Sequence, residues 1–183
     1  MALQLERAGH RVVAIDPEAP PGAIFRRVTL EEFAEPGPFD AVVASRSLHH
    51  IPDLAGALDR IALLLPQEGT VIVNEHAWDR LDEQTARWAL DHWPEGHDHA
   101  PRSLPDFLAW WRAEHAGLHG YEAIRAELER RFVEREFAWA PYLYGDLHGA
   151  VEPIEEWRLI EAGAIRATGF RYVGVRGRPA PDD

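Results

Sequence analysis

Residues 39–76 read FDAVVASRSLHHIPDLAGALDRIALLLPQEGTVIVNEH, and this segment decides the fold expected for the chain. It opens on a short apolar run at residues 41–44 and closes on a second one at residues 70–73. Between them, residues 53–65 carry apolar side chains at helical spacing, and the proline and glycine of residues 66–69 end that pattern. A strand, a helix and a strand at this spacing predict a right-handed crossover in a parallel sheet. The sequence therefore predicts an α/β fold.

The flanking sequence extends the same alternation in both directions. Residues 1–8 are typical of the end of a helix, with Gly9 as its C-cap, and residues 11–15 and 24–29 are expected to be strands. Residues 29–32 have the pattern of a short helical start with a capping box. Towards the C-terminus, we expect helices over 80–90, 104–115, 121–132 and 154–162, and strands over 132–144 and 168–175.

The composition of the chain excludes several classes of partner and of chemistry. The 31 acidic and 19 basic side chains give a net charge of −12, which argues against a nucleic-acid partner. No apolar run approaches the ~20 residues that a membrane span needs, and the N-terminus does not resemble a signal peptide. The absence of cysteine excludes disulfides, thiolate metal sites and cysteine nucleophiles. Every basic residue is arginine, which excludes Schiff-base chemistry on lysine. We therefore expect a cytoplasmic protein that acts without membrane or nucleic acid.

Asp16 is the first candidate binding residue. It follows the predicted strand at residues 11–15, and ligands of doubly wound sheets bind at the carboxyl ends of strands. Its carboxylate suits both hydroxyls of a ribose. An aspartate before Pro17 is equally typical of a turn, and position alone does not separate these interpretations.

Three stretches carry a family resemblance. Residues 39–53, FDAVVASRSLHHIPD, resemble the FDxVxxxxxLHHxxD segment of class I S-adenosylmethionine-dependent methyltransferases, in the small-molecule, type 11/12-like branch. Residues 57–76 look like that family's next helix, turn and fifth strand, and residues 158–176 are similar to its closing helix and last strand. The resemblance implies a Rossmann-like sheet, mostly parallel with an antiparallel last strand. It further implies one domain over residues 1–177, a helical lid over 77–131 and a disordered tail at 178–183.

The resemblance also assigns roles to single residues. It implies S-adenosylmethionine as methyl donor, S-adenosylhomocysteine as product and a small organic molecule as acceptor. The residues it places around the cofactor are Asp16 at the ribose, Thr29 and the backbone of Leu30 at the adenine, and Ser45 and Arg46 at the methionine end.

His49 and His50 are the candidate catalytic residues. The resemblance places them at the opening of the next helix, near the methyl-transfer face. Methyl transfer mainly requires donor and acceptor to be held in line, and a base is needed only if the acceptor loses a proton. Histidine suits that task because its pKa lies near neutrality. Simple packing of one of the two rings is the competing interpretation.

The start of the chain departs from the family. The family's first strand and glycine-rich loop would precede residues 2–16, and that strand would lie in the centre of the sheet. Two other functions are therefore weighed: a non-catalytic methyltransferase-fold binding or assembly module, in which a homo-oligomer completes the sheet, and a nicotinamide-dependent oxidoreductase. The oxidoreductase would explain Asp16, but the chain has no G-x-G-x-x-G motif and residues 39–53 are foreign to that class.

The remaining candidates have plain structural explanations. Residues 95–99 with His92 have histidine and carboxylate groups, but a solvated loop is favoured over a metal site, so no metal is expected. Glu75 and His76 end a predicted strand, where they either shape the acceptor pocket or make a supporting hydrogen bond. Arg46 and Arg102 would suit an acidic substrate group. Aromatic side chains line an acceptor pocket or fill the core: Trp88, Trp93, Phe107, Trp110, Trp111, Trp139, Tyr142 and Tyr144.

Overall fold

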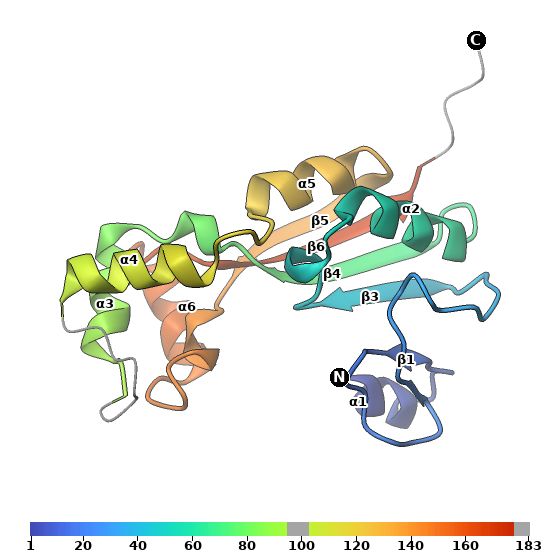
Figure 1. Cartoon of the computed structure of the whole chain (residues 1–183), viewed down its shortest axis with the longest axis horizontal. Helices are drawn as coiled ribbons and strands as arrows, with labels where there is room; N and C mark the ends of the chain where they lie inside the picture. Colours follow the sequence, from blue (N-terminus) through green and yellow to red (C-terminus); the bar gives the residue numbers. More distant parts are fainter. Residues whose placement is uncertain (95–102, 178–183) are drawn as a thin grey trace, which may run out of the picture.

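The computed structural model describes residues 1–94 and 103–177 and contains a four-stranded mixed sheet. Its strands are β3 (Ala41–Ser45), β4 (Thr70–His76), β5 (Phe132–Ala140) and β6 (Gly169–Arg176), in the spatial order β3-β4-β6-β5. β3 and β4 are parallel, whereas β6 is antiparallel to both β4 and β5. The expected α/β fold, with its antiparallel last strand, is confirmed (Figure 1).

A second, two-stranded sheet lies apart from the first, next to α1 (Ala2–Arg7) (Figure 1). Its strands β1 (Ala14–Ile15) and β2 (Phe25–Arg26) are parallel to each other. Within the described residues, β1 pairs only with β2 and β3 pairs only with β4, so each has one edge without a strand partner. β1 and β2 are only two residues long, whereas the sequence predicts longer strands at residues 11–15 and 24–29. They are short because pairing on one edge satisfies few backbone groups.

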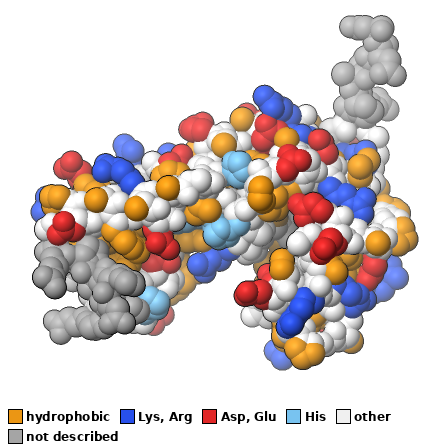
Figure 2. Space-filling view, in the orientation of Figure 1, with side chains coloured by type: hydrophobic (Ala, Val, Ile, Leu, Met, Phe, Trp, Pro, Cys, Tyr) orange, Lys and Arg blue, Asp and Glu red, His pale blue; other side chains and the backbone are white. Residues whose placement is uncertain are grey.

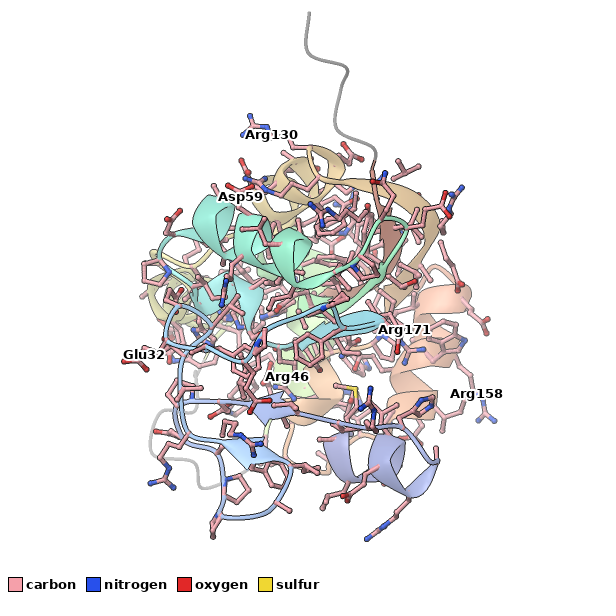
Figure 3. All side chains as sticks on the ribbon, turned by 90° about the vertical axis from the view of Figure 1, so that its right-hand side faces the viewer. Glu32, Arg46, Asp59, Arg130, Arg158 and Arg171 are labelled. Carbon is pink, nitrogen blue, oxygen red and sulfur yellow. The ribbon has the colours of Figure 1, made fainter. Side chains whose placement is uncertain are left out.

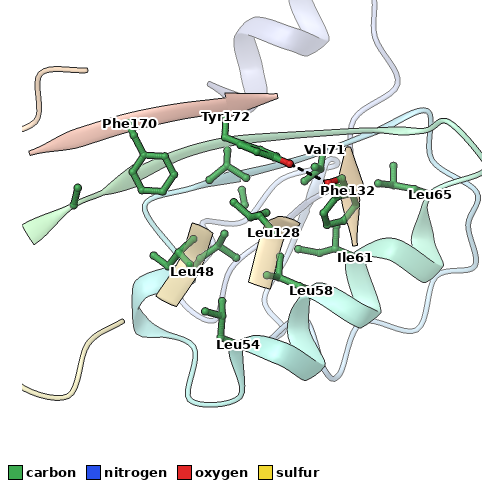
Figure 4. Close-up of a cluster of buried hydrophobic side chains, with 14 residues drawn as sticks. Leu48, Leu54, Leu58, Ile61, Leu65, Val71, Leu128, Phe132, Phe170 and Tyr172 are labelled. Atoms are coloured by element: carbon green, nitrogen blue, oxygen red, sulfur yellow. Dashed lines mark hydrogen bonds between the residues drawn. The ribbon is translucent and has the colours of Figure 1, made fainter. Parts of the chain in front are cut away.

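Helix α2 (Leu54–Leu64) forms where the apolar spacing predicts it. The Asp53 side chain caps its N-terminus by accepting the N–H of Gly56 at 2.9 Å. With α5 (Tyr121–Glu129), it covers one face of the large sheet (Figure 1). Each leucine-sized side chain that the helices bury there stabilises the fold by about 1.5–3 kcal/mol. Figure 4 shows this core, which includes Leu54, Leu58 and Ile61 of α2, Leu128 of α5, and Val71 and Tyr172 of the sheet.

The remaining helices extend beyond the carboxyl end of β4 (Figure 1). α3 (Glu83–Asp91) and α4 (Leu104–Glu114) pack on each other around a second apolar cluster that includes Phe107 and Trp111. α6 (Pro153–Glu161) follows β5, and its C-cap Ala162 is followed by Gly163, whose φ of +69° is the left-handed conformation common just after a helix. Within the described residues, no helix combines the length and apolar character that a membrane crossing requires.

The helical start expected at residues 29–32 is wrong. The reciprocal capping bonds do form, from the Thr29 N–H to Glu32 Oε2 at 3.2 Å and from the Glu32 N–H to Thr29 Oγ1 at 3.3 Å. No helix follows them, because Pro36 and Pro38 prevent the next turns. The capping pattern therefore closes a turn here.

Candidate active site

The carboxyl ends of β3 and β4 lie side by side because the two strands are parallel and in register. Ser45, the last residue of β3, is opposite Asn74, and the Arg46 N–H donates to the Asn74 carbonyl at 2.9 Å. The chain then forms a turn of 3-10 helix, η1 (Leu48–His50), beside Glu75. This is the edge of an α/β sheet at which ligands bind.

Glu75 holds this turn in place. Its side chain is completely buried at the end of β4. Oε1 accepts the N–H groups of Ser47 at 2.5 Å and Leu48 at 2.6 Å, and Oε2 accepts the N–H of His76 at 2.8 Å. A single carboxylate therefore satisfies three backbone donors that would otherwise be buried without partners.

His49 supplies the fourth contact of the Glu75 carboxylate. Its Nδ1 lies 2.5 Å from Glu75 Oε2, and its side chain is only 5% exposed. A carboxylate oxygen accepts hydrogen bonds, so His49 Nδ1 is the donor in this contact. Among the described residues, Nε2 of His49 has no hydrogen-bond partner.

His50 has a different environment, although the two rings are neighbours with centroids 4.1 Å apart. His50 is exposed to solvent, in contrast to His49. The partial burial of its ring, together with the charge of His49, lowers the pKa of His50. The expectation that both histidines open the next helix is wrong. They form η1 instead, and α2 begins only at Leu54, because Pro52 restricts the backbone that precedes it.

His76 occupies the centre of the cluster. Its ring stacks on Tyr142, with centroids 3.9 Å apart and planes 2° from parallel, and lies 5.0 Å from the ring of His115. Burial, with the charges of His115 and His49, lowers the pKa of His76 to about 2. Its Nε2 is enclosed without a hydrogen-bond partner among the described residues. The ring is therefore neutral at any ordinary pH.

A second buried glutamate holds the turn that carries Tyr142. This turn is η3 (Leu143–Gly145), and Glu156 of α6 accepts the N–H groups of Tyr142 at 2.8 Å, Leu143 at 3.1 Å and Tyr144 at 2.7 Å. The pKa of Glu156 is raised above its ordinary value, because the effect of burial exceeds the opposing effect of these three hydrogen bonds. No sequence pattern indicates this role, because Glu155 and Glu156 in a first helical turn are typical of a solvated N-terminus.

Arg46 connects the two turns. Its Nε donates to the Tyr142 hydroxyl at 3.1 Å, and its guanidinium carbon lies 4.6 Å from the centre of the Tyr142 ring. Arg46 has a φ of +56°, a left-handed conformation that is uncommon for a residue with a side chain. Figure 3 shows Arg46 on the side of β3 that faces the small sheet.

The family follows from a match over most of the chain. A family model described as methyltransferase domain matches residues 1–138. The chain belongs to this methyltransferase family. It is 33% identical over 107 residues to the ubiquinone biosynthesis O-methyltransferase of Dechloromonas aromatica (strain RCB), a match that covers 55% of this chain and 46% of that protein. The chain thus spans about half of this curated relative.

Solved structures agree with the methyltransferase fold. The 1,6-didemethyltoxoflavin-N1-methyltransferase of Burkholderia thailandensis has a TM-score of 0.55 and 15% identity, over 96% of this chain and 65% of that chain. A protein from Pyrococcus horikoshii OT3 has a TM-score of 0.54 and 11% identity, over 96% of this chain and 76% of that chain. At these identities the likeness supports the fold alone.

Three of the residues that were expected near the cofactor, Asp16, Ser45 and Arg46, lie at or just beyond the end of a strand. Ser45 and Arg46 lie at the end of β3, in the cluster with His49. Asp16 follows β1, where its Oδ1 accepts the N–H of Glu18 at 2.7 Å, so the turn interpretation is confirmed. The structure does not bring every candidate together, because Asp16, Thr29 and Leu30 belong to the segment around the small sheet, and no hydrogen bond of theirs reaches the cluster.

The other candidates divide between the core and the residues that are not described. Residues 95–99 and Arg102 lie outside the described residues, and within the described part no group of histidine and acidic side chains is arranged to hold a metal ion. Among the expected pocket aromatics, Tyr142 stacks on His76 and Trp111 lies 5.6 Å from it. Tyr144 lies close enough to Arg46 to raise the pKa of its guanidinium. Trp93 packs on Phe107, and Trp139 lies under the guanidinium of Arg80.

Proposed function

We propose that this chain binds S-adenosylmethionine and transfers its methyl group to a small organic acceptor, releasing S-adenosylhomocysteine. The observation that carries the proposal is the convergence of Ser45, Arg46 and His49 at the carboxyl end of the sheet in a chain of the methyltransferase family. The Dechloromonas relative is named an O-methyltransferase, and the Burkholderia neighbour is an N-methyltransferase solved with S-adenosylhomocysteine. Those names support the same donor for this chain.

The residues present fit this cofactor. Asp16 is exposed and uses one carboxylate oxygen in its turn, which leaves the other to accept from a ribose hydroxyl. The terminal guanidinium nitrogens of Arg46 make no hydrogen bond to a described residue, and they suit the methionine carboxylate. When bound, S-adenosylmethionine supplies a methyl group on a sulfonium, which transfers by in-line displacement.

We extend the proposal to the helices beyond β4. Trp111 of α4 and its C-cap residue His115 contact the ring of His76, with centroids 5.6 Å and 5.0 Å away. The N–H of the Trp111 indole donates to the Trp78 carbonyl at 3.0 Å, which fixes α4 to the chain that leaves β4. In this proposal α3 and α4 cover the acceptor and exclude water from the reacting atoms.

The test is calorimetric titration of the full chain with S-adenosylhomocysteine. We expect saturable one-to-one binding, weakened about 10- to 100-fold in Asp16→Ala, since hydrogen bonds to a charged group contribute about 1.5–3 kcal/mol. Glu18→Ala is the matched control, because it removes a neighbouring acid and retains the backbone N–H that Asp16 accepts. Absence of binding, or equal affinities of the two variants, would contradict the proposal.

A further inference from the structure

We propose that a groove between α3 and α6 binds a small aromatic molecule that carries one carboxylate and one N–H or O–H donor. The groove has a volume of about 380 Å³, within the range of about 300–1,000 Å³ that small-molecule sites occupy. It is lined by residues of α3, of the turn that precedes α6 and of α6 itself. The site is separate from the candidate active site and independent of the proposed function.

The groove lies on the side of α6 that faces away from the candidate active site. Among the described residues, it shares no lining residue with the cluster around His49. Its lining residues on α6 are Glu155, Arg158 and Leu159, which fall on one face of the helix at three- and four-residue spacing. Glu156, which holds η3, is buried instead. All three lining residues lie beyond the part of the chain that the family model matches. A ligand in this groove is therefore distinct from the cofactor and from the methyl acceptor.

Apolar side chains and an indole ring favour an aromatic ligand. Val151 is buried and Leu159 is half-buried where they line the groove. Trp88 of α3 is also half-buried, so part of its ring remains open to the groove. Aromatic rings prefer to stack offset or edge-on against an indole, and a flat ligand gains the most contact area on such a surface. The lining therefore selects a flat ring over an extended polar molecule.

His92 supplies an oriented hydrogen-bond acceptor at the same groove. It is the C-cap residue of α3, and its Nδ1 lies 2.8 Å from the Trp88 carbonyl oxygen. A carbonyl oxygen only accepts, so Nδ1 donates, and the neutral ring has its lone pair on Nε2. Within the described residues, Nε2 has no hydrogen-bond partner. The ring centroids of His92 and Trp88 are 5.1 Å apart, so a ligand on the indole lies beside an acceptor for its own N–H or O–H group.

Arg158 supplies the positive charge. It is exposed on α6, and its guanidinium makes no hydrogen bond or ion pair with a described residue. Glu155 is one helical turn away, yet the two side chains do not form an ion pair. Glu155 instead accepts the N–H of Glu152 at 3.0 Å in the capping box of α6. Figure 3 shows Arg158 extending from α6 towards solvent. Its fork of N–H donors is therefore free to bind a carboxylate through two parallel hydrogen bonds.

The charge at the groove favours a monoanion over a phosphate ester. Arg158 is the only permanent cation among the described lining residues, and Glu155 adds a carboxylate to the same groove. Figure 2 shows acidic side chains, together with apolar ones, on the end of the molecule that α3, α4 and α6 form. Because the whole chain has a net charge of −12, it repels a dianion more strongly than a monoanion. One carboxylate per ligand is the charge that the groove suits.

Titration of the full chain with indole-3-acetate tests the site. This probe has an aromatic ring, an N–H donor and one carboxylate. With nitrogen-labelled tryptophan, NMR should show a saturable shift of the Trp88 indole signal, identified by its loss in Trp88→Phe, and a Kd below about 1 mM. Indole-3-acetamide has the same shape without the charge and should bind about three- to tenfold more weakly, since water screens an exposed charge pair. Equal affinities for the two probes, or no saturable shift of the Trp88 signal, would overturn the inference.

Exposed variants assign the contacts without disturbing the core. Arg158→Gln keeps a long polar side chain without the charge, so it should weaken indole-3-acetate about three- to tenfold and leave indole-3-acetamide within about twofold. His92→Phe keeps a ring but removes the accepting nitrogen, so it should weaken both probes. Arg87→Gln is the matched control, because Arg87 is an exposed arginine of α3 that does not line the groove. Equal losses in Arg158→Gln and Arg87→Gln would mean that net charge alone attracts the probe, which contradicts the assigned site.

The groove and the proposed function fail in different measurements. Indole-3-acetate should bind in the absence of S-adenosylhomocysteine, and Arg158→Gln should leave S-adenosylhomocysteine affinity within about twofold, because the two sites share no residue. Loss of the Trp88 shift on saturation with S-adenosylhomocysteine would place the probe in the cofactor site and refute the groove. A chain that binds indole-3-acetate but not S-adenosylhomocysteine would contradict only the proposed function.

Discussion

Glu75 and Glu156 perform the same structural task at two turns of the molecule, yet only one of them reaches a side chain that can do chemistry. Each is a completely buried glutamate that accepts three backbone N–H groups and thereby holds a 3-10 turn. Glu75 has a further contact, to His49 Nδ1, whereas no side chain among the described residues makes a hydrogen bond to Glu156. The difference teaches that a buried carboxylate indicates function only when its hydrogen bonds extend beyond the backbone.

The largest effect is expected when the purely structural glutamate is removed. Glu156→Leu leaves three N–H groups without acceptors, and at about 1–3 kcal/mol for each the free energy of unfolding should fall by at least about 3 kcal/mol. Urea unfolding of the full chain measures this loss. Glu161→Leu, an exposed glutamate on the same helix, should change stability by less than about 0.5 kcal/mol. Equal effects of the two substitutions would show that η3 does not depend on Glu156.

The next effect concerns His76, which lies between the two turns. Its pKa of about 2 in the folded chain is below the ordinary value of 6.5, so the unfolded chain binds the proton first as the pH falls. Stability that is fully present above pH 6.5 is therefore lost on acidification, at up to about 1.4 kcal/mol per pH unit for this group.

Urea unfolding between pH 4 and pH 8 checks this dependence. His76→Phe keeps an aromatic ring on Tyr142 but cannot bind a proton, so its stability should decline less steeply with acid than that of the unmodified chain. Parallel curves for the two proteins would mean that folding does not lower the pKa of His76.

The smallest effect concerns the contact between the turns. Tyr142→Phe removes the hydrogen bond from Arg46 Nε and should cost about 1 kcal/mol, or roughly 2–4 °C in Tm for a chain of this size. Calorimetric melting measures the shift. An unchanged Tm would show that this hydrogen bond does not stabilise the contact between η1 and η3.

Much of the fold could be predicted because its signals are local. The apolar spacing of α2, the runs of β3 and β4, and the glycine at the end of α6 act over a few residues, and the structure confirms each of them. The family expected from residues 39–53 is confirmed by the match over residues 1–138. The short β1 and β2 could not be predicted in length, because the extent of a strand depends on its neighbours in the sheet.

The place of Ser45, Arg46 and His49 in the fold could be predicted from the sequence, but the hydrogen bonds around them could not. These three residues lie at or just after the end of a strand, which places them at one edge of the sheet. The contacts of Glu75 join residues 26–28 positions apart in sequence, and the contacts of Glu156 join residues 12–14 positions apart. Such hydrogen bonds are set by the packing of whole elements, and no local pattern around Glu156 distinguishes it from a solvated acid.

The left-handed backbone of Arg46 limits how much the stability of this chain can be raised by a substitution at position 46. A side chain at φ of +56° costs of order 1 kcal/mol, which glycine would recover. Yet only a long cationic side chain can lie over the Tyr142 ring from this position. Glycine at position 46 would relieve this strain, but it would also remove the hydrogen bond to the Tyr142 hydroxyl, which contributes about 1 kcal/mol. The two effects are opposite in sign and similar in size, so the strained backbone of Arg46 is offset by the contact between η1 and η3 that it makes possible.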